Sequence, residues 1–246
     1  MNILLIAEGE KTEKQFFKNI GKLYLNKGSV LHIFSYKTHI FTLYKKIKEA
    51  RETFTETIRT LREIAKNDPD IEILNNKFAY IYLVFDFERH DPNFGYDKLF
   101  DMIKLFNDET EKGKLYINYP MVESYKDHSK FDEDDYCLRD CAVCNGHNYK
   151  RQVNLRGYQK RLKDYKKEDF NGICRLNLIK TSRLSDGRQG LLDYEKYGLF
   201  AQQEKILSAV KEYIESKDTI PILNTSIFFL TDYFGKTFFN EIMSEK

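Results

Sequence analysis

Carboxylates follow three apolar segments of the chain, near the points where the segments end. Glu8 follows "ILLIA", Asp86 and Glu88 come directly after "YIYLVF", and Glu123 lies just past "KLYINYP". In open α/β sheets, ligands bind beyond the carboxyl ends of the strands, so these acids are expected to converge. Their mutual repulsion calls for a cation, and Mg²⁺, or Mn²⁺ in its place, takes oxygen ligands from carboxylates, phosphate and water. The pattern therefore predicts a metal site with four candidate ligands: Glu8, Asp86, Glu88 and Glu123.

Each of these acids also has a simpler explanation. Glu8 could be a surface acid that the positive end of the following helix favours by ~0.3 to 1 kcal/mol, and Asp86 and Glu88 could merely end a strand. The long apolar run before Asp86 favours the site, because it delivers both acids to the sheet edge. Their spacing puts them on one side if the strand continues. Glu10 and Glu13 are expected to serve the first helical turn, although Glu13 could reach the site.

The elements that must position these acids alternate along the first half of the chain. A run that is apolar at every position, as in "FAYIYLVF", implies burial on both faces of a parallel sheet. Helical spacing separates such runs, which is the pattern of an α/β fold with a mostly parallel sheet flanked by helices. The expected strands are 2–7, 29–36, 78–85 and 114–120, and the expected helices begin at Thr12 and cover 41–66 and 96–106.

The pattern changes beyond about residue 128. An acidic and cysteine-bearing stretch and a basic stretch form an insertion over 129–170, and a helical C-terminal region over 171–246 is expected to pack on the 1–128 core. Two long helices are expected there, at about 196–217 and 220–245. The aromatic residues of "NTSIFFLTDYFGKTFF" are expected to pack between helices, with a homodimer surface as the alternative.

Composition limits the classes of protein to consider. Aromatic residues make up 15% of the chain, which argues against general disorder. No apolar run approaches the roughly 20 residues needed to span a bilayer, and the N-terminus lacks signal-peptide features, so a cytoplasmic protein is expected. The formal net charge of +2 gives no bias of the whole chain toward polyanions. Any nucleic-acid binding must therefore depend on local patches.

One such patch is the stretch 148–167, which holds eight Lys or Arg residues against one acid, with three interleaved Tyr residues. Cations would neutralise phosphates and Tyr could stack on unpaired bases, with an affinity that falls as salt rises. A solvated helix face is the alternative. The candidate nucleic-acid-binding residues are Lys150, Arg151, Arg156, Lys160 and Arg161.

The cysteines suggest a second metal. Cys137, Cys141, Cys144 and His147 provide four ligands that suit tetrahedral Zn²⁺. The alternative is three thiols that bind no metal. Cys174 is expected in the core.

The first half of the chain resembles a known family. The segment from Glu8 to Glu13, "EGEKTE", opening a helix after the first strand, and the later "VFDFERHD" resemble the Toprim domain, in particular the RloB-like and OLD-like nucleases of bacterial anti-phage systems. "YPMVESY" is similar to a later segment of those proteins. The resemblance covers roughly residues 1–128. The chain has Asp86-Phe-Glu88 where the family pattern is Asp-x-Asp.

The resemblance implies a Toprim-like (Rossmann-like) fold and a metal-dependent endonuclease. Glu8 would act in acid/base chemistry or metal binding, Asp86 and Glu88 would be the main metal ligands, and Asp91 or Glu123 would complete the outer shell. A metal-held water or hydroxide would attack a phosphodiester. Such proteins resemble toxic effectors of abortive infection, such as the PARIS effector, which act on RNA, including tRNA, or DNA with an ABC-type or AAA-type ATPase partner.

Two other functions remain open. A catalytically degenerate adaptor that binds nucleic acid or an ATPase would also fit, because the Asp-x-Glu departure could mark a vestigial site. A Toprim-type phosphotransfer enzyme other than a nuclease is the third candidate.

Overall fold

The computed structural model describes residues 1–49, 57–143, 146–187 and 192–244 of the chain. The chain divides into two compact units, Met1–Tyr116 and Ile117–Lys246. Each unit is described separately below.

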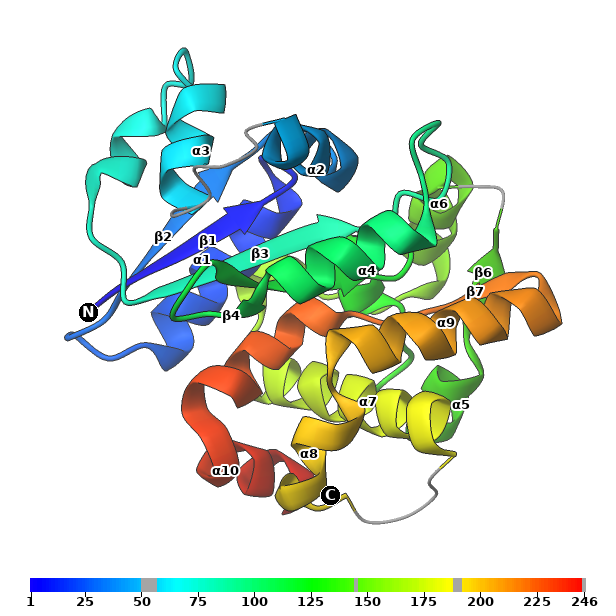
Figure 1. Ribbon diagram of the computed structural model, residues 1–246. Helices are drawn as coiled ribbons and strands as arrows, with labels where there is room; N and C mark the ends of the chain where they lie inside the picture. Colours follow the sequence, from blue (N-terminus) through cyan, green and yellow to red (C-terminus); the bar gives the residue numbers. More distant parts are fainter. Residues whose placement is uncertain (50–56, 144–145, 188–191, 245–246) are drawn as a thin grey trace. The chain divides into compact units, whose positions relative to one another are not determined.

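The first unit contains a five-stranded sheet in the order β2-β1-β3-β5-β4 (Figure 1). The strand β1 pairs in parallel with β2 and β3, and the short β4 pairs antiparallel with β5. The strands are β1 (Asn2–Ala7), β2 (Val30–Ser35), β3 (Tyr80–Asp86), β4 (Asn107–Asp108) and β5 (Gly113–Asn118). The predicted α/β class with a mostly parallel sheet is therefore confirmed.

The two central strands are buried on both faces, as their continuous apolar sequences predict. The residues from Ile3 to Ala7 in β1 and from Leu83 to Phe85 in β3 are fully buried. In the parallel register, Ala7 lies opposite both Ser35 of β2 and Val84 of β3. The residue after β1 therefore lies beside the end of β3.

Helices of the first unit pack around this sheet. α1 (Thr12–Tyr24) packs against β2, and α2 (Ile40–Glu49) packs against α4 (Tyr96–Leu105). The helix predicted over 41–66 is described as α2 and α3 (Thr57–Ile64), and the residues between them lie outside the described part of the chain. A short 3₁₀ helix, η1 (Ile71–Asn75), leads into β3.

The second unit is mostly helical and is built around α7 (Lys167–Asp186). Residues along this helix, including Phe170, Ile173 and Leu178, are fully buried, and the helix contacts α5, α8, α9, α10 and η4 (Figure 1). The helices are η2 (Val122–Lys126), α5 (Glu133–Leu138), α6 (Gly146–Arg156), η3 (Leu162–Asp164), α7, α8 (Tyr194–Phe200), α9 (Gln203–Lys217), η4 (Thr225–Phe228) and α10 (Phe229–Ser244). Two short strands, β6 (Asp140–Ala142) and β7 (Thr219–Pro221), pair antiparallel.

Both predicted C-terminal helices differ from the structure. The 196–217 segment forms α8 and α9, because Gln202 adopts an extended conformation between them. The 220–245 segment begins with β7, because Thr219–Pro221 pairs antiparallel with β6. The aromatic residues Phe228, Phe229 and Phe239 are fully buried.

Candidate functional site

Glu8 lies at the junction of the two central strands. Its backbone N donates to Val84 O at 3.1 Å, which extends the β1–β3 ladder by one residue. Its side-chain Oε2 accepts a hydrogen bond from the backbone N of Asp86 at 3.0 Å. The backbone N–H of Asp86 thus holds the Glu8 carboxyl against the end of β3.

Burial and neighbouring negative charges favour the protonated form of Glu8. The pKa of its carboxyl is raised from 4.5 to about 8, mainly by burial, with further contributions from the charges of Glu88 and Glu13. The hydrogen bond from Asp86 N acts in the opposite direction. Glu8 also hydrogen-bonds to the carboxyl of Glu88, which requires a proton on one of the two groups. We call Glu8, Glu13, Asp86 and Glu88 the acidic cluster.

Glu13 reaches this cluster from the first turn of α1. Its Oε1 accepts a hydrogen bond from Gly9 N at 3.1 Å, and its side chain is buried. A Cβ atom at position 9 would lie 2.4 to 2.7 Å from atoms of the Glu13 carboxyl group, so a larger residue there would require the Glu13 side chain to shift. Glu10, in contrast, is exposed and pairs with Lys37 Nζ at 3.2 Å. The first turn of α1 therefore contributes Glu13 to the cluster, whereas Glu10, in the segment before the helix, faces solvent.

The chain turns immediately after Asp86, so the strand does not continue to Glu88. Glu88 N donates to Asp86 O at 3.0 Å and Arg89 N donates to Phe87 O at 2.8 Å. Phe87 is buried against Phe94, with ring centroids 5.4 Å apart. Glu88 meets Glu8 because of this turn, and not because of the strand alternation on which the sequence prediction depended.

Asp91 and Glu123 have other partners. Asp91 Oδ2 lies 3.0 Å from His39 Nδ1, just before α2. Glu123 lies in the second unit, where its buried carboxylate pairs with Lys150 Nζ at 2.6 Å. A role for either acid in a metal site stays a prediction.

Four of the five predicted nucleic-acid-binding cations pair with acids of the second unit. Lys150 pairs with Glu123, Arg156 with Asp127 at 2.7 Å, Lys160 with Asp169 at 2.5 Å and Arg161 with Asp164 at 2.7 Å. The first three of these acids are buried. Arg151 is exposed on α6. Composition alone indicated eight cations against one acid, but acids from elsewhere in the chain neutralise many of those charges.

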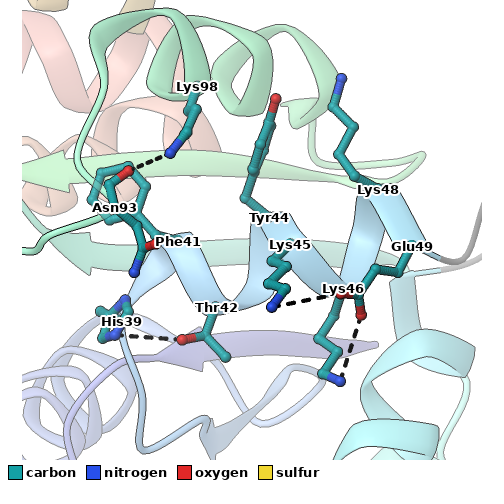
Figure 2. Close-up of a pocket in the computed structure, with 10 residues that line it drawn as sticks. All are labelled: His39, Phe41, Thr42, Tyr44, Lys45, Lys46, Lys48, Glu49, Asn93 and Lys98. Atoms are coloured by element: carbon teal, nitrogen blue, oxygen red, sulfur yellow. Dashed lines mark hydrogen bonds and ion pairs between the residues drawn. The ribbon is translucent and has the colours of Figure 1, made fainter.

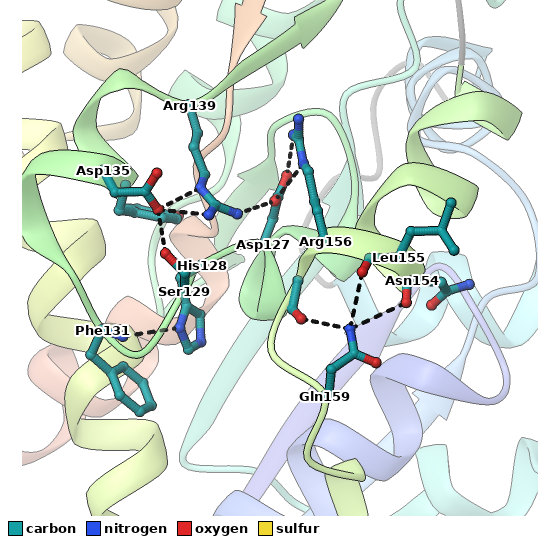
Figure 3. A network of polar contacts seen from close by, with 12 residues as sticks. Asp127, His128, Ser129, Phe131, Asp135, Arg139, Asn154, Leu155, Arg156 and Gln159 are labelled. Carbon is teal, nitrogen blue, oxygen red and sulfur yellow. Dashed lines mark hydrogen bonds and ion pairs between the residues drawn. The ribbon is translucent and has the colours of Figure 1, made fainter.

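Asp127 is the centre of a charged network that the sequence did not reveal (Figure 3). This fully buried carboxylate accepts hydrogen bonds from Arg139 Nη1 at 2.8 Å and from Arg156 Nε and Nη2 at 3.0 and 2.7 Å. Arg139 also pairs with Asp135 at 2.6 Å. Two guanidinium groups that share one buried carboxylate connect η2, α5 and α6.

The zinc prediction falls partly outside the described residues. Cys144 lies outside them, and the side chain of His147 on α6 is likewise not described. Cys141 on β6 is buried, which raises the pKa of its thiol to about 12. Cys137 is half-buried, and Cys174 is fully buried, as expected.

Within the described ranges, no three His, Cys, Asp or Glu side chains are arranged so that they could hold a metal ion. No helix in that part of the chain has the length and apolar character needed to cross a membrane. Comparisons with known protein families, characterised proteins and solved structures find no match to this chain.

Proposed function

We propose that this chain is a Mg²⁺-dependent nuclease of the Toprim type that cleaves phosphodiester bonds at the acidic cluster. One observation carries the proposal. Glu8 lies at the carboxyl end of β1 beside Asp86, and nearby carboxylates and burial raise the pKa of its carboxyl to about 8. Such perturbed carboxylates at strand ends are typical of functional sites in α/β folds.

The residues of the cluster fit a hard divalent cation. Their side chains offer only oxygen ligands, as Mg²⁺ and Mn²⁺ prefer. Mg²⁺ commonly uses only one or two protein carboxylates and completes its shell with water and phosphate, so a preformed cage of three acids is not required. Glu8, Asp86 and Glu88 would hold the ion. When bound, it would neutralise the negative charge on the phosphate and activate a water molecule.

The protein groups have separate roles in this proposal. The Asp86 N–H fixes the orientation of Glu8 Oε2, and the neighbouring Glu88 favours the protonated form of the Glu8 carboxyl. A carboxyl with a pKa of about 8 can accept or release a proton near neutral pH, which suits general acid/base catalysis. Phe87 and the other buried residues around the turn keep the backbone of this segment fixed.

Substitution of the acidic cluster tests the proposal. Glu8→Gln and Asp86→Asn are each expected to lower Mg²⁺-dependent cleavage of tRNA, single-stranded RNA or DNA by about 10²-fold or more, because each removes a metal ligand or proton-transfer group. Glu10→Gln is the matched control, since Glu10 is two residues away but exposed and paired with Lys37. Gel assays measure cleavage and circular dichroism checks folding. Wild-type rates in both folded variants would contradict the proposal.

In its cellular role, we propose that the nuclease is a toxic effector of anti-phage defence, released or activated by an ATPase partner. The support is the Toprim-like pattern of "EGEKTE" and "VFDFERHD". Expression of the wild-type chain in bacteria is expected to arrest growth, and Glu8→Gln is expected to relieve the arrest.

A degenerate adaptor is the second candidate function. Two observations favour it: Asp86-Phe-Glu88 departs from Asp-x-Asp, and the described residues hold no preformed three-ligand group. An adaptor would bind RNA or an ATPase in a salt-sensitive manner without cleaving with either Mg²⁺ or Mn²⁺. The cleavage assay above therefore separates the two functions.

A further inference from the structure

A basic pocket of about 640 Å³ lies in the first unit, between α2 and the loop that leads into α4 (Figure 2). We call it the α2 pocket. Its charged lining consists of Lys45, Lys46, Lys48 and Lys98, with Glu49 as the acid among the lining residues. The volume is in the range of pockets that hold small organic ligands, so it could admit one nucleotide unit.

Exposed acids pair with the lysines of the α2 pocket. Lys45 and Lys46 share Glu49, at 3.8 and 3.6 Å, and Lys48 pairs with Asp101 at 3.3 Å. Lys98 donates to the backbone carbonyl of Asn93 at 2.6 Å. Lys45, Lys46, Lys48 and Lys98 thus carry four positive charges against two negative ones, and exposed pairs of this kind contribute little energy. A phosphate group can therefore replace these partners at low cost.

This arrangement differs from the basic stretch of the second unit. There, the acids that pair with Lys150, Arg156 and Lys160 have side chains with exposed fractions of 5%, 0% and 6%. Glu49 and Asp101 have exposed fractions of 51% and 52%. Releasing a cation from a buried carboxylate leaves an uncompensated charge, whereas releasing one from an exposed carboxylate does not. The α2 lysines are thus the more available cations.

Two short connections join the α2 pocket to the acidic cluster within the same unit. Lys37 N donates to the backbone O of Glu8 at 2.9 Å, three residues before α2 begins. His39 Nδ1 lies 3.0 Å from Asp91 Oδ2, three residues after Glu88. The loop that starts at Asp86 continues to Asn93, which lines the pocket. The start of α2 is therefore fixed to both segments that carry the acidic cluster.

We infer that the α2 pocket binds the phosphodiester backbone of a single-stranded nucleic acid whose neighbouring bond reaches the acidic cluster. This inference rests on the proposed nuclease function. An acidic cluster repels a polyanionic strand, so cations beside it are needed to hold the strand in place. Tyr44 lines the pocket and Lys48 lies 5.3 Å from its ring centroid. Lysines with a nearby aromatic ring are typical of surfaces that bind single strands.

A salt titration tests the inference. The probe is a fluorescein-labelled mixed-sequence RNA of about 20 nucleotides, with a DNA of the same sequence as a second arm, and binding is followed by anisotropy in EDTA so that no cleavage occurs. The Lys45→Ala/Lys46→Ala variant is expected to bind about tenfold more weakly. The slope of log K against log salt should become shallower by about 1 to 1.5, because two phosphate contacts are lost.

The matched control is Lys205→Ala/Lys211→Ala on α9. Lys211 pairs with exposed Glu215 at the same i,i+4 spacing that joins Lys45 to Glu49. The control is expected to bind RNA as the wild type does. Equal affinity and equal salt slope for the α2 variant and wild type would overturn the inference, and so would an equal loss in the α9 control.

Two further readouts separate the possible failures. If the α2 substitutions weaken binding of AMP by calorimetry but leave RNA binding unchanged, the pocket is a mononucleotide site and the inference is overturned. Cleavage with Mg²⁺ is measured separately. If RNA binding depends on the α2 lysines but the protein does not cleave, only the nuclease proposal is contradicted. If the protein cleaves but the α2 variant binds RNA as the wild type does, only the inferred role of the α2 pocket is contradicted.

Discussion

The metal-free protein is expected to lose stability as the pH rises from about 5 to about 8, and Glu8→Gln is expected to remove that loss. The pKa of Glu8 in the folded protein is about 8, against an ordinary value of 4.5. Between these values the folded chain binds more protons than the unfolded chain, so the free energy of unfolding falls with rising pH. The loss of unfolding free energy is absent below the ordinary pKa of 4.5 and complete above the folded-state pKa of about 8.

The size of this effect follows from the shift. One pKa unit corresponds to about 1.4 kcal/mol, so the loss is expected to reach a few kcal/mol. Glutamine stays neutral at every pH, can accept the hydrogen bond from Asp86 N and can donate to Glu88. Glu8→Gln should therefore make the metal-free protein more stable above pH 8, while it lowers the rate of cleavage.

Urea denaturation at successive pH values gives the free energy of unfolding of the wild type and of Glu8→Gln. The difference between these two free energies measures the effect. Other buried groups titrate in the same range. Burial lowers the pKa of His128 to about 4 and that of Lys180 to about 7, and both shifts make stability rise with pH. Because both residues are present in the two proteins, the difference isolates Glu8. A difference that does not vary between pH 5 and pH 8 would contradict the assignment.

Asp127→Ala is expected to cost about 1.5–3 kcal/mol, because it removes the buried carboxylate that accepts charge-assisted hydrogen bonds from two guanidinium groups. Asp127 is fully buried and accepts hydrogen bonds from both Arg139 and Arg156 (Figure 3). The side chain of Arg139 is only 14% exposed. Its guanidinium would keep Asp135 as a partner, whereas Arg156 would lose both of its bonds to Asp127.

Asp164→Ala provides the control for this substitution. Asp164 pairs with Arg161 at 2.7 Å, but both side chains are exposed, at 43% and 71%. Such a pair contributes about 0–1 kcal/mol. Urea denaturation of the two variants measures the contrast, and a cost for Asp127→Ala no larger than that for Asp164→Ala would show that the network does not stabilise the second unit.

The parallel sheet could be predicted from the sequence because β1 after Asn2 and β3 before Asp86 are continuously apolar and lie buried on both faces. The same pattern predicted that Glu8 and Asp86 lie at the same edge of the sheet, because parallel strands end at one edge. The strand order that makes β1 and β3 direct neighbours comes from the structure and not from the local sequence.

Other parts of the site depend on contacts between distant segments and could not be predicted in this way. Glu13 joins the acidic cluster from the first turn of α1, where its carboxylate accepts a hydrogen bond from the backbone of Gly9. Glu88 reaches Glu8 through a turn where strand alternation was expected. The basic stretch pairs with acids such as Glu123 and Asp127, which are remote in sequence, so composition overstated its free charge.

The C-terminal helices show the limit of periodicity alone. The segment after α9 is rich in apolar residues, and helical spacing fits it as well as a strand does. Thr219–Pro221 forms a strand because it pairs with β6, which lies far away in the sequence. Strand partners that lie far away in the sequence leave no local signal.

The most direct test of the proposed metal site is anomalous diffraction from crystals soaked in Mn²⁺. We predict an anomalous peak bound by carboxylate oxygens of Glu8, Asp86 and Glu88, which is lost in Asp86→Asn crystals. A peak found only elsewhere, or no peak in a protein that cleaves RNA with Mn²⁺, would contradict the assignment of the acidic cluster as the metal centre.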